Sequence, residues 1–206
     1  MEDKVSAIID ILKAKYPDPA FALHYEKDYE LMIAVRLSAQ CTDARVNMIT
    51  PALFAAYPTL ESMAAAPIEH IEELVHSCGF YKHKARDIVL ACQMLLSKHN
   101  GKVPNTMDDL LALPGVGRKT ANLLLGDLYK EPGSVGCDTH CIRICGRLGL
   151  SQGKEPEKVE KQLRAILPPE ESSDFCHRIV LFGREICTAR NPKCGACPLS
   201  MWCSAI

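Results

Sequence analysis

The sequence has neither a long hydrophobic run nor an export signal. Nowhere in its 206 residues is there an apolar stretch near the roughly 18–20 residues that a membrane span needs. The first residues, Met1-Glu2-Asp3-Lys4-Val5, carry acidic side chains and begin no sustained apolar segment, unlike a secretory signal. We therefore expect a cytoplasmic protein that has no membrane partner.

An excess of positive charge is also missing. The formal net charge is −1 at pH 7, whereas a protein that held nucleic acid mainly by bulk electrostatics should be plainly basic. Basic residues are nevertheless concentrated in residues 81–100, where Asp87 is the only acid, and in residues 176–203, where Glu185 is the only acid. Each stretch alone is typical of a solvated helix face, but together they allow a local basic surface on a nearly neutral protein.

The alternation of apolar and polar residues that marks β-strands is absent as well. Helical spacing replaces it: the apolar residues of 71–78 recur at i, i+3, i+4 and i+7. Asp43, Thr106 and Ser173-Asp174 precede such stretches, as N-caps do. We predict an all-α protein with helices at about 3–15, 29–38, 43–56, 59–65, 68–77, 82–98, 106–112, 117–129, 139–148, 155–166 and 173–187.

One turn-rich break, Lys130-Glu131-Pro132-Gly133-Ser134, interrupts the helical pattern. A chain of this length can form one large domain or two small ones, and either can bury a core. The chain has no internal repeat and no low-complexity tract. We therefore place a domain boundary at the break, with residues 21–131 as one helical unit.

The most informative segment is Leu113-Pro114-Gly115-Val116-Gly117-Arg118-Lys119-Thr120-Ala121-Asn122. Its glycines predict a tight turn, because glycine accepts positive φ angles and allows another molecule to approach the backbone closely. The turn opens into the helix expected at 117–129, whose first N–H groups can bind a phosphate oxygen. Lys119 stands one turn into that helix, where the positive end of the helix dipole disfavours a further positive charge. A lone lysine is usually a surface residue, but this combination indicates chemistry on a nucleic-acid backbone.

Cysteine, in contrast, is abundant, with 11 residues. In a reducing cytosol these are thiols or metal ligands. Four of them have the spacing C-x6-C-x2-C-x5-C, which predicts either tetrahedral zinc or a four-iron four-sulfur cluster, and the single short arm favours the cluster. They are Cys187, Cys194, Cys197 and Cys203. Arg190 and Lys193 in the first loop are either cations presented to phosphate or ordinary exposed charges. Cys137, Cys141 and Cys145 follow helical spacing and are expected to be buried apolar residues.

The glycine hairpin, Lys119, the segment Cys137-Asp138-Thr139-His140 and the four C-terminal cysteines occur in an order that resembles the endonuclease III family. Members of this family are helix-hairpin-helix DNA glycosylases with an iron–sulfur cluster. The resemblance runs from about residue 20 to Cys203. It implies two helical domains with a cleft between them: a barrel domain, residues 21–131, that carries the hairpin, and a cluster domain, residues 1–20 plus 132–206, in which the four cysteines hold one 4Fe-4S cluster.

The resemblance also implies the roles of individual residues. Lys119 matches the nucleophile and Asp138 its paired carboxylate, although Asp138 also suits the N-cap of the helix that begins at Thr139. Ser38-Ala39-Gln40 matches a loop whose glutamine fills the gap left by an extruded base. Gly79-Phe80-Tyr81 matches the opposite wedge loop, with Phe80 where the family leads us to expect leucine. The residues that we expect to contact DNA are Gln40, Phe80, Gly115, Val116, Gly117, Arg118, Arg190 and Lys193.

These features predict a bifunctional DNA glycosylase and AP lyase of base excision repair. It would remove oxidised or ring-saturated pyrimidines through a lysine imine and cleave 3′ to the abasic site by β-elimination. Its partner would be double-stranded DNA with damaged bases or abasic sites, bound by a nucleoid-associated monomer. The alternatives are a monofunctional mismatch or adenine glycosylase of the same fold, which has no lysine at position 119, and a non-catalytic DNA-binding iron–sulfur protein.

Overall fold

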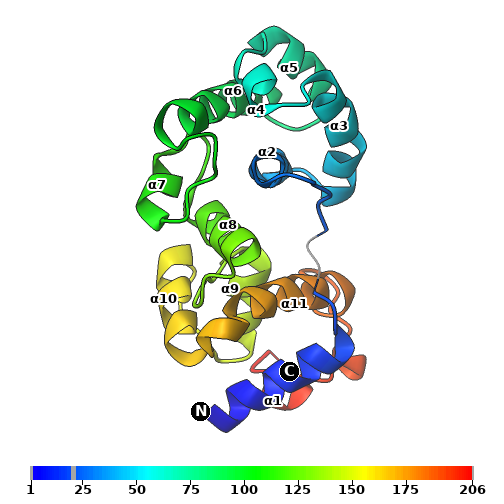
Figure 1. Ribbon diagram of the computed structural model, residues 1–206. Helices are drawn as coiled ribbons and strands as arrows, with labels where there is room; N and C mark the ends of the chain where they lie inside the picture. Colours follow the sequence, from blue (N-terminus) through cyan, green and yellow to red (C-terminus); the bar gives the residue numbers. More distant parts are fainter. Residues whose placement is uncertain (1, 20–21, 206) are drawn as a thin grey trace. The chain divides into compact units, whose positions relative to one another are not determined.

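The computed structural model describes residues 2–19 and 22–205, and within these ranges it contains helices and no β-strand (Figure 1). The all-α prediction is therefore confirmed, and every helix expected from the sequence is present. None of the helices in the described ranges combines the length and the apolar character that crossing a membrane requires. The α-helices are α1 Glu2–Lys15, α2 Asp28–Ser38, α3 Asp43–Ala56, α4 Leu60–Ala64, α5 Ile68–Leu74, α6 Tyr81–Lys98, α7 Met107–Ala112, α8 Arg118–Tyr129, α9 Thr139–Arg147, α10 Pro156–Ile166 and α11 Ser172–Glu185; the 3-10 helices are η1 Pro169–Glu171, η2 Cys194–Ala196 and η3 Ser200–Trp202.

The helix starts follow the expected capping chemistry in part. The Thr106 hydroxyl accepts a hydrogen bond from Asp109 N at 3.3 Å, so Thr106 is the predicted N-cap. The cap of α3 is Thr42, whose hydroxyl accepts from the backbone of Arg45, and not Asp43, which is already helical. The expected cap at Ser173-Asp174 is also wrong, because α11 begins at Ser172 directly after η1, without a side-chain cap.

The chain divides into two compact units. Of the described residues, one unit contains 22–124, and the other contains 2–19 together with 125–205. The division falls inside α8, between Leu124 and Leu125. The domain boundaries predicted from the sequence, with the break after residue 131, stay a prediction.

The unit of residues 22–124 is built around α2. Eight of the residues of α2 are buried, including the polar Glu30, and Figure 1 shows α3 to α7 arranged around this helix. A helix that is buried on nearly all sides needs neighbours on all sides, which explains its almost continuous apolar sequence from Leu31 to Val35. Its C-terminal end leads directly into the loop that contains Gln40.

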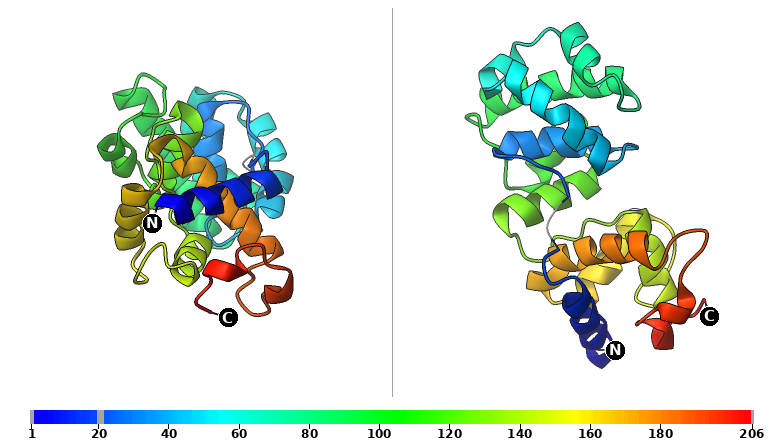
Figure 2. Two further views of the ribbon diagram at one scale, coloured as in Figure 1. Left: turned by 90° about the horizontal axis from the view of Figure 1, so that it is seen from below. Right: turned by 90° about the vertical axis from the view of Figure 1, so that its right-hand side faces the viewer.

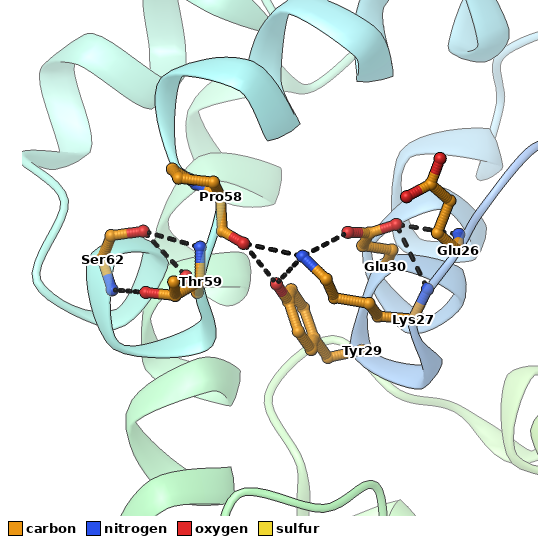
Figure 3. Close-up of polar contacts among 7 residues, drawn as sticks. All are labelled: Glu26, Lys27, Tyr29, Glu30, Pro58, Thr59 and Ser62. Atoms are coloured by element: carbon orange, nitrogen blue, oxygen red, sulfur yellow. Dashed lines mark hydrogen bonds and ion pairs between the residues drawn. The ribbon is translucent and has the colours of Figure 1, made fainter.

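Polar contacts fix the start of α2 to the segment before α4 (Figure 3). Lys27 Nζ donates a hydrogen bond to the Pro58 carbonyl at 2.7 Å, and the Tyr29 hydroxyl donates to the same oxygen at 3.3 Å. The Glu30 carboxylate accepts from the backbone N–H groups of Glu26 and Lys27, so it caps these two donors at the start of the helix. These contacts hold the N-terminal end of α2 in place.

The other unit combines the N-terminal helix with the C-terminal part of the chain, from Leu125 onward. Its core consists of apolar residues from α1, α9, α10 and α11, and α1 packs against α11 (Figure 2). Phe175 and Phe182 of α11 are among its largest buried side chains. This core supports the loop of residues 187–203 through Ile186 and Leu199, which are buried in it.

Candidate functional site

The turn between α7 and α8 has the conformation that its glycines predict. Gly115 has a φ of +77°, in the left-handed region that favours glycine, and Val116 N donates to the Leu113 carbonyl at 3.1 Å. Leu113 and Val116 are buried, so the side chain of Val116 is directed into the protein. The helix begins at Arg118, one residue later than expected.

The residues of the turn that a ligand could contact are those exposed on its surface. Gly115, Gly117, Arg118 and Lys119 are all exposed. A Cβ atom on Gly117 would meet no atom of the protein within 4 Å. The absence of a side chain there leaves open space next to the first N–H groups of α8, as a phosphate-binding turn requires.

An ion pair lies directly beneath this turn. Arg36 of α2 donates from Nε and Nη2 to Asp87 Oδ2 of α6, at 2.9 and 2.6 Å. A Cβ atom on Gly115 would lie only 2.5 Å from Arg36 Nε and 2.8 Å from Asp87 Oδ2. Gly115 is therefore required both by its backbone angle and by its contact with the ion pair. No local sequence pattern indicates this pairing, whose partners are 51 positions apart.

The two loops that carry Gln40 and Phe80 lie side by side. A Cβ atom on Gly79 would lie 3.5 Å from the Gln40 carbonyl oxygen. Gln40 and Phe80 both have left-handed backbones, with φ values of 54° and 58°, and both are exposed, Phe80 by 64%. Non-glycine residues rarely adopt this conformation, and it is concentrated at binding and catalytic sites. The structure thus brings together the two residues that the sequence predicts to enter DNA.

Lys84 holds these loops from inside, a role that sequence reasoning missed. Its side chain is only 1% exposed, and Nζ donates to the carbonyls of Leu37 and Ala39 at 2.8 and 2.7 Å. The ammonium group thereby satisfies carbonyls at the C-terminal end of α2, where positive charge is favourable. Burial lowers the pKa of Lys84. The available signal was that Lys84 lies one helical turn before Ile88, on the apolar stripe of α6.

The predicted catalytic residues lie in different units. Lys119 is exposed in the first turn of α8, in the unit of residues 22–124. Asp138 belongs to the other unit and is the N-cap of α9, since its Oδ1 accepts from Cys141 N at 2.8 Å. The capping role of Asp138 is confirmed, whereas its pairing with Lys119 stays a prediction.

The four C-terminal cysteines line one cavity, together with Arg147, Ile186, Pro192, Lys193 and Ala205. Burial raises the pKa of the Cys197 thiol, and the charges of the other three thiols add to the rise. Arg147 Nη1 donates to Cys187 Sγ at 3.1 Å, and Arg143 Nη2 donates to the Cys187 carbonyl at 2.9 Å. Four convergent thiols with a cationic hydrogen-bond donor suit an iron–sulfur group, which carries negative charge. Arg190 and Lys193 are exposed on the loop of this site.

The cysteines that follow helical spacing in the sequence are core residues, as expected, although Cys137 precedes α9 and only Cys141 and Cys145 lie in that helix. Cys137, Cys141 and Cys145 are buried, and the sulfur atoms of Cys141 and Cys145 lie 3.9 Å apart. Among the described residues, no group of three or more His, Cys, Asp or Glu side chains is arranged to hold a single metal ion.

Comparison with known proteins identifies the class. Residues 33–169 match the model of the HhH-GPD superfamily of base excision DNA repair proteins, and residues 187–203 match the iron–sulfur binding domain of endonuclease III. The chain is 41% identical to endonuclease III of Synechocystis sp. over 202 residues, which cover 98% of this chain and 92% of that protein. It is 39% identical to endonuclease III of Escherichia coli K12, covering 95% of this chain and 92% of that protein.

The solved structures agree with the sequence matches. The structure of a trapped endonuclease III–DNA covalent intermediate matches with a TM-score of 0.93 and 41% identity, covering 99% of this chain and 96% of that chain. A thermostable thymine-DNA glycosylase, at 21% identity and a TM-score of 0.84, shares the fold. This chain belongs to the endonuclease III family, and it carries the iron–sulfur binding segment of that family.

The packing of the turn predicts that alanine at Gly115 affects stability, whereas alanine at Gly117 affects DNA binding. We expect Gly115→Ala to lower the free energy of unfolding by about 2 kcal/mol or more, because alanine disfavours the left-handed angle and its Cβ displaces Arg36. Gly117→Ala should leave stability within about 0.5 kcal/mol of wild type, since its Cβ meets open space, but should weaken DNA binding by obstructing the close approach. Urea unfolding and a DNA-binding titration measure the two effects. Equal stability losses in both variants would contradict this account.

The buried lysine gives a second prediction. Lys84→Met keeps the apolar stem but leaves the Leu37 and Ala39 carbonyls without their donor, which should cost about 1–3 kcal/mol of stability. Lys82→Met, on the exposed face of the same helix, is the matched control and should unfold like wild type. If both variants unfold at the same urea concentration, the Lys84 hydrogen bonds do not stabilise the fold.

Proposed function

We propose that this endonuclease III family member, a DNA glycosylase and AP lyase of base excision repair, removes oxidised or ring-saturated pyrimidines through an imine on Lys119. The observation that carries the proposal is the placement of Lys119: its side chain is exposed in the first turn of α8, two residues after the open backbone of Gly117. A phosphate bound at the turn would place the adjoining sugar within reach of this amine.

Access to the lesion comes first, because a base inside a duplex cannot be reached and the nucleotide must be swung out. The space that it leaves has to be filled. Gln40 offers hydrogen bonds to the unpaired opposite base, and Phe80 offers an apolar wedge. The two residues project from adjacent loops of one unit, which supports a joint action on the same lesion.

The covalent step follows from the chemistry of an amine. Neutral Lys119 Nζ attacks the anomeric carbon of the sugar, and the damaged base leaves with the electrons of the broken bond and gains a proton. The nitrogen loses its proton and the ring opens to an imine. Loss of a proton from the neighbouring carbon then expels the 3′ phosphate by β-elimination, and water releases the lysine. Arg118 and the start of α8 supply the positive field next to this amine.

Asp138 is the proposed carboxylate partner. Its Oδ1 is engaged by the N-terminus of α9, so the reaction would use the other oxygen. There it could stabilise the developing sugar cation or transfer protons. The hydrogen bond at Oδ1 fixes the carboxylate in one orientation, as a positioned catalytic group requires.

The iron–sulfur group is proposed to be one 4Fe-4S cluster on Cys187, Cys194, Cys197 and Cys203. Each cysteine of such a cluster binds a different iron, so the sulfur atoms stand farther apart than around one zinc ion. The cavity that the four thiols share, and the match of residues 187–203 to an iron–sulfur binding domain, support this choice. When bound, the cluster would serve as a structural staple, and Arg190 and Lys193 on its loop would present positive charge to DNA phosphates.

Trapping the imine tests the catalytic proposal. A duplex with a thymine glycol is incubated with the protein and reduced with borohydride, which should give a covalent protein–DNA adduct. Lys119→Ala and the charge-preserving Lys119→Arg should both lose the adduct, while Lys102→Ala, an exposed lysine of the same unit, should retain it. Strand cleavage without any adduct would exclude the imine, base release without cleavage would indicate a monofunctional glycosylase, and binding without base release would indicate a non-catalytic DNA-binding protein.

Metal analysis tests the cluster. We expect about four iron and four sulfide ions per chain and a brown protein, with the iron lost in Cys197→Ser. Cys176→Ala, at a buried thiol of the same unit, should keep its iron. A colourless protein with stoichiometric zinc would overturn the assignment.

A further inference from the structure

Two cysteines outside the iron–sulfur site, Cys41 and Cys78, lie next to the loops that carry Gln40 and Phe80. The sulfur atoms of Cys41 and Cys78 are hydrogen-bonded to each other at 3.7 Å, although the residues are 37 positions apart in the chain. Cys41 directly follows Gln40, and Cys78 directly precedes Gly79 and Phe80. Neither the repair chemistry nor the iron–sulfur site uses these thiols.

Accessibility separates this pair from the other thiols. Of the seven cysteines outside the iron–sulfur cavity, six are buried and Cys41 alone is partly exposed. The sulfur atoms of Cys141 and Cys145 are almost as close, at 3.9 Å, but both residues are fully buried on one helix. A small molecule in solution can therefore reach Cys41. Its partner, Cys78, is only 1% exposed and is not directly accessible.

We propose that Cys41 and Cys78 form a dithiol modification site that a small disulfide oxidises to an intramolecular disulfide joining the Gln40 loop to the Phe80 loop. The partly exposed Cys41 is the attacking residue, and the buried Cys78 is the resolving residue.

The chemistry needs only a disulfide oxidant and balances as an exchange of thiols. The Cys41 thiolate attacks one sulfur of the oxidant, whose S–S bond breaks and releases one thiol. Cys78 then loses its proton and attacks Cys41 Sγ, which displaces the second thiol. Two protein thiols are oxidised, and the oxidant is reduced to two thiols. A disulfide bond is about 2.05 Å long, so the sulfur atoms must approach each other by roughly 1.7 Å.

The surroundings favour this order of events. Burial raises the pKa of Cys78 to about 11, and the hydrogen bond with Cys41 acts in the same direction. Cys78 therefore stays protonated at rest and is unsuited to be the first nucleophile. The positive charges of Lys84 and Arg45 oppose this rise and would stabilise the thiolate when Cys78 resolves the mixed disulfide.

The consequence for activity rests on the proposed function. If Gln40 and Phe80 fill the gap in DNA, a covalent link next to both residues restrains the left-handed backbones that present them. We expect the oxidised protein to bind lesion DNA and release the base at least about fivefold less well, a typical size for coupling between two sites.

The modification itself is tested on the iron–sulfur holoprotein with oxidised glutathione, followed by peptide mapping without reduction. Wild type should give a Cys41–Cys78 cross-linked peptide, with the visible absorbance of the cluster unchanged. Cys78→Ser should stop at a stable glutathione adduct on Cys41, and Cys41→Ser should show neither product. Cys92→Ser, at a buried lone thiol of α6, should behave like wild type. A wild-type protein that stays reduced, or that keeps glutathione on Cys41, overturns the proposal.

Activity measured on the same samples separates the two proposals. Oxidised wild type should lose base release and regain it after treatment with a dithiol reductant, while Cys41→Ser should be unaffected by the oxidant. A mapped disulfide with unchanged activity would refute the effect on the loops. A reduced protein that releases no base would refute the proposed function, and the peptide map would still decide whether the dithiol site exists.

Discussion

The ion pair between Arg36 and Asp87 is the contact on which the presentation of the hairpin depends. It joins α2 to α6, and the Gly115 turn rests directly on it. Only glycine fits above this pair without displacing it, so the turn packs directly on the ion pair, three residues before α8 begins and four before the exposed Lys119. A half-buried ion pair contributes little to stability by itself once its desolvation is counted. Its importance here is geometric, because it supports the backbone turn that is proposed to contact DNA.

Contacts to other elements hold α2 along its whole length. Lys27, Tyr29 and Glu30 fix its first turn (Figure 3), Arg36 supports the hairpin, and Lys84 holds the carbonyls at its last turn. The loop after this turn contains Gln40 and lies against the loop of Phe80. One buried helix therefore positions both the turn that is proposed to bind phosphate and the residues that are proposed to fill the gap in DNA. Functional residues have to be held in a fixed geometry, and here their loops are anchored to a rigid, buried helix.

Much of this could be predicted from local sequence. The helices, the Gly115 turn, the Thr106 cap and the cysteine spacing depend on residues close together in the chain, so periodicity and capping chemistry reveal them. Lys84, the Arg36–Asp87 pair and the Cys41–Cys78 pair depend on contacts between residues 37 or more positions apart. No local pattern marks these contacts. Lys84 belongs to the basic stretch of residues 81–100, but its ammonium group is buried and bonded to backbone carbonyls.

The distribution of charge resolves the apparent conflict between a net charge of −1 and a DNA-directed function. Each of the two basic stretches contains one acid, and both acids are neutralised within their own unit. Asp87 is paired with Arg36, and Glu185 is bonded to Lys15 and to the hydroxyl of Tyr16. The cations that remain exposed on these stretches are Lys82, Arg86, Lys98, Arg184, Arg190 and Lys193. DNA responds to the local field within about 10 Å at ordinary ionic strength and not to the total charge. A nearly neutral chain can therefore present positive surfaces to phosphates, because its acids in these stretches are already paired.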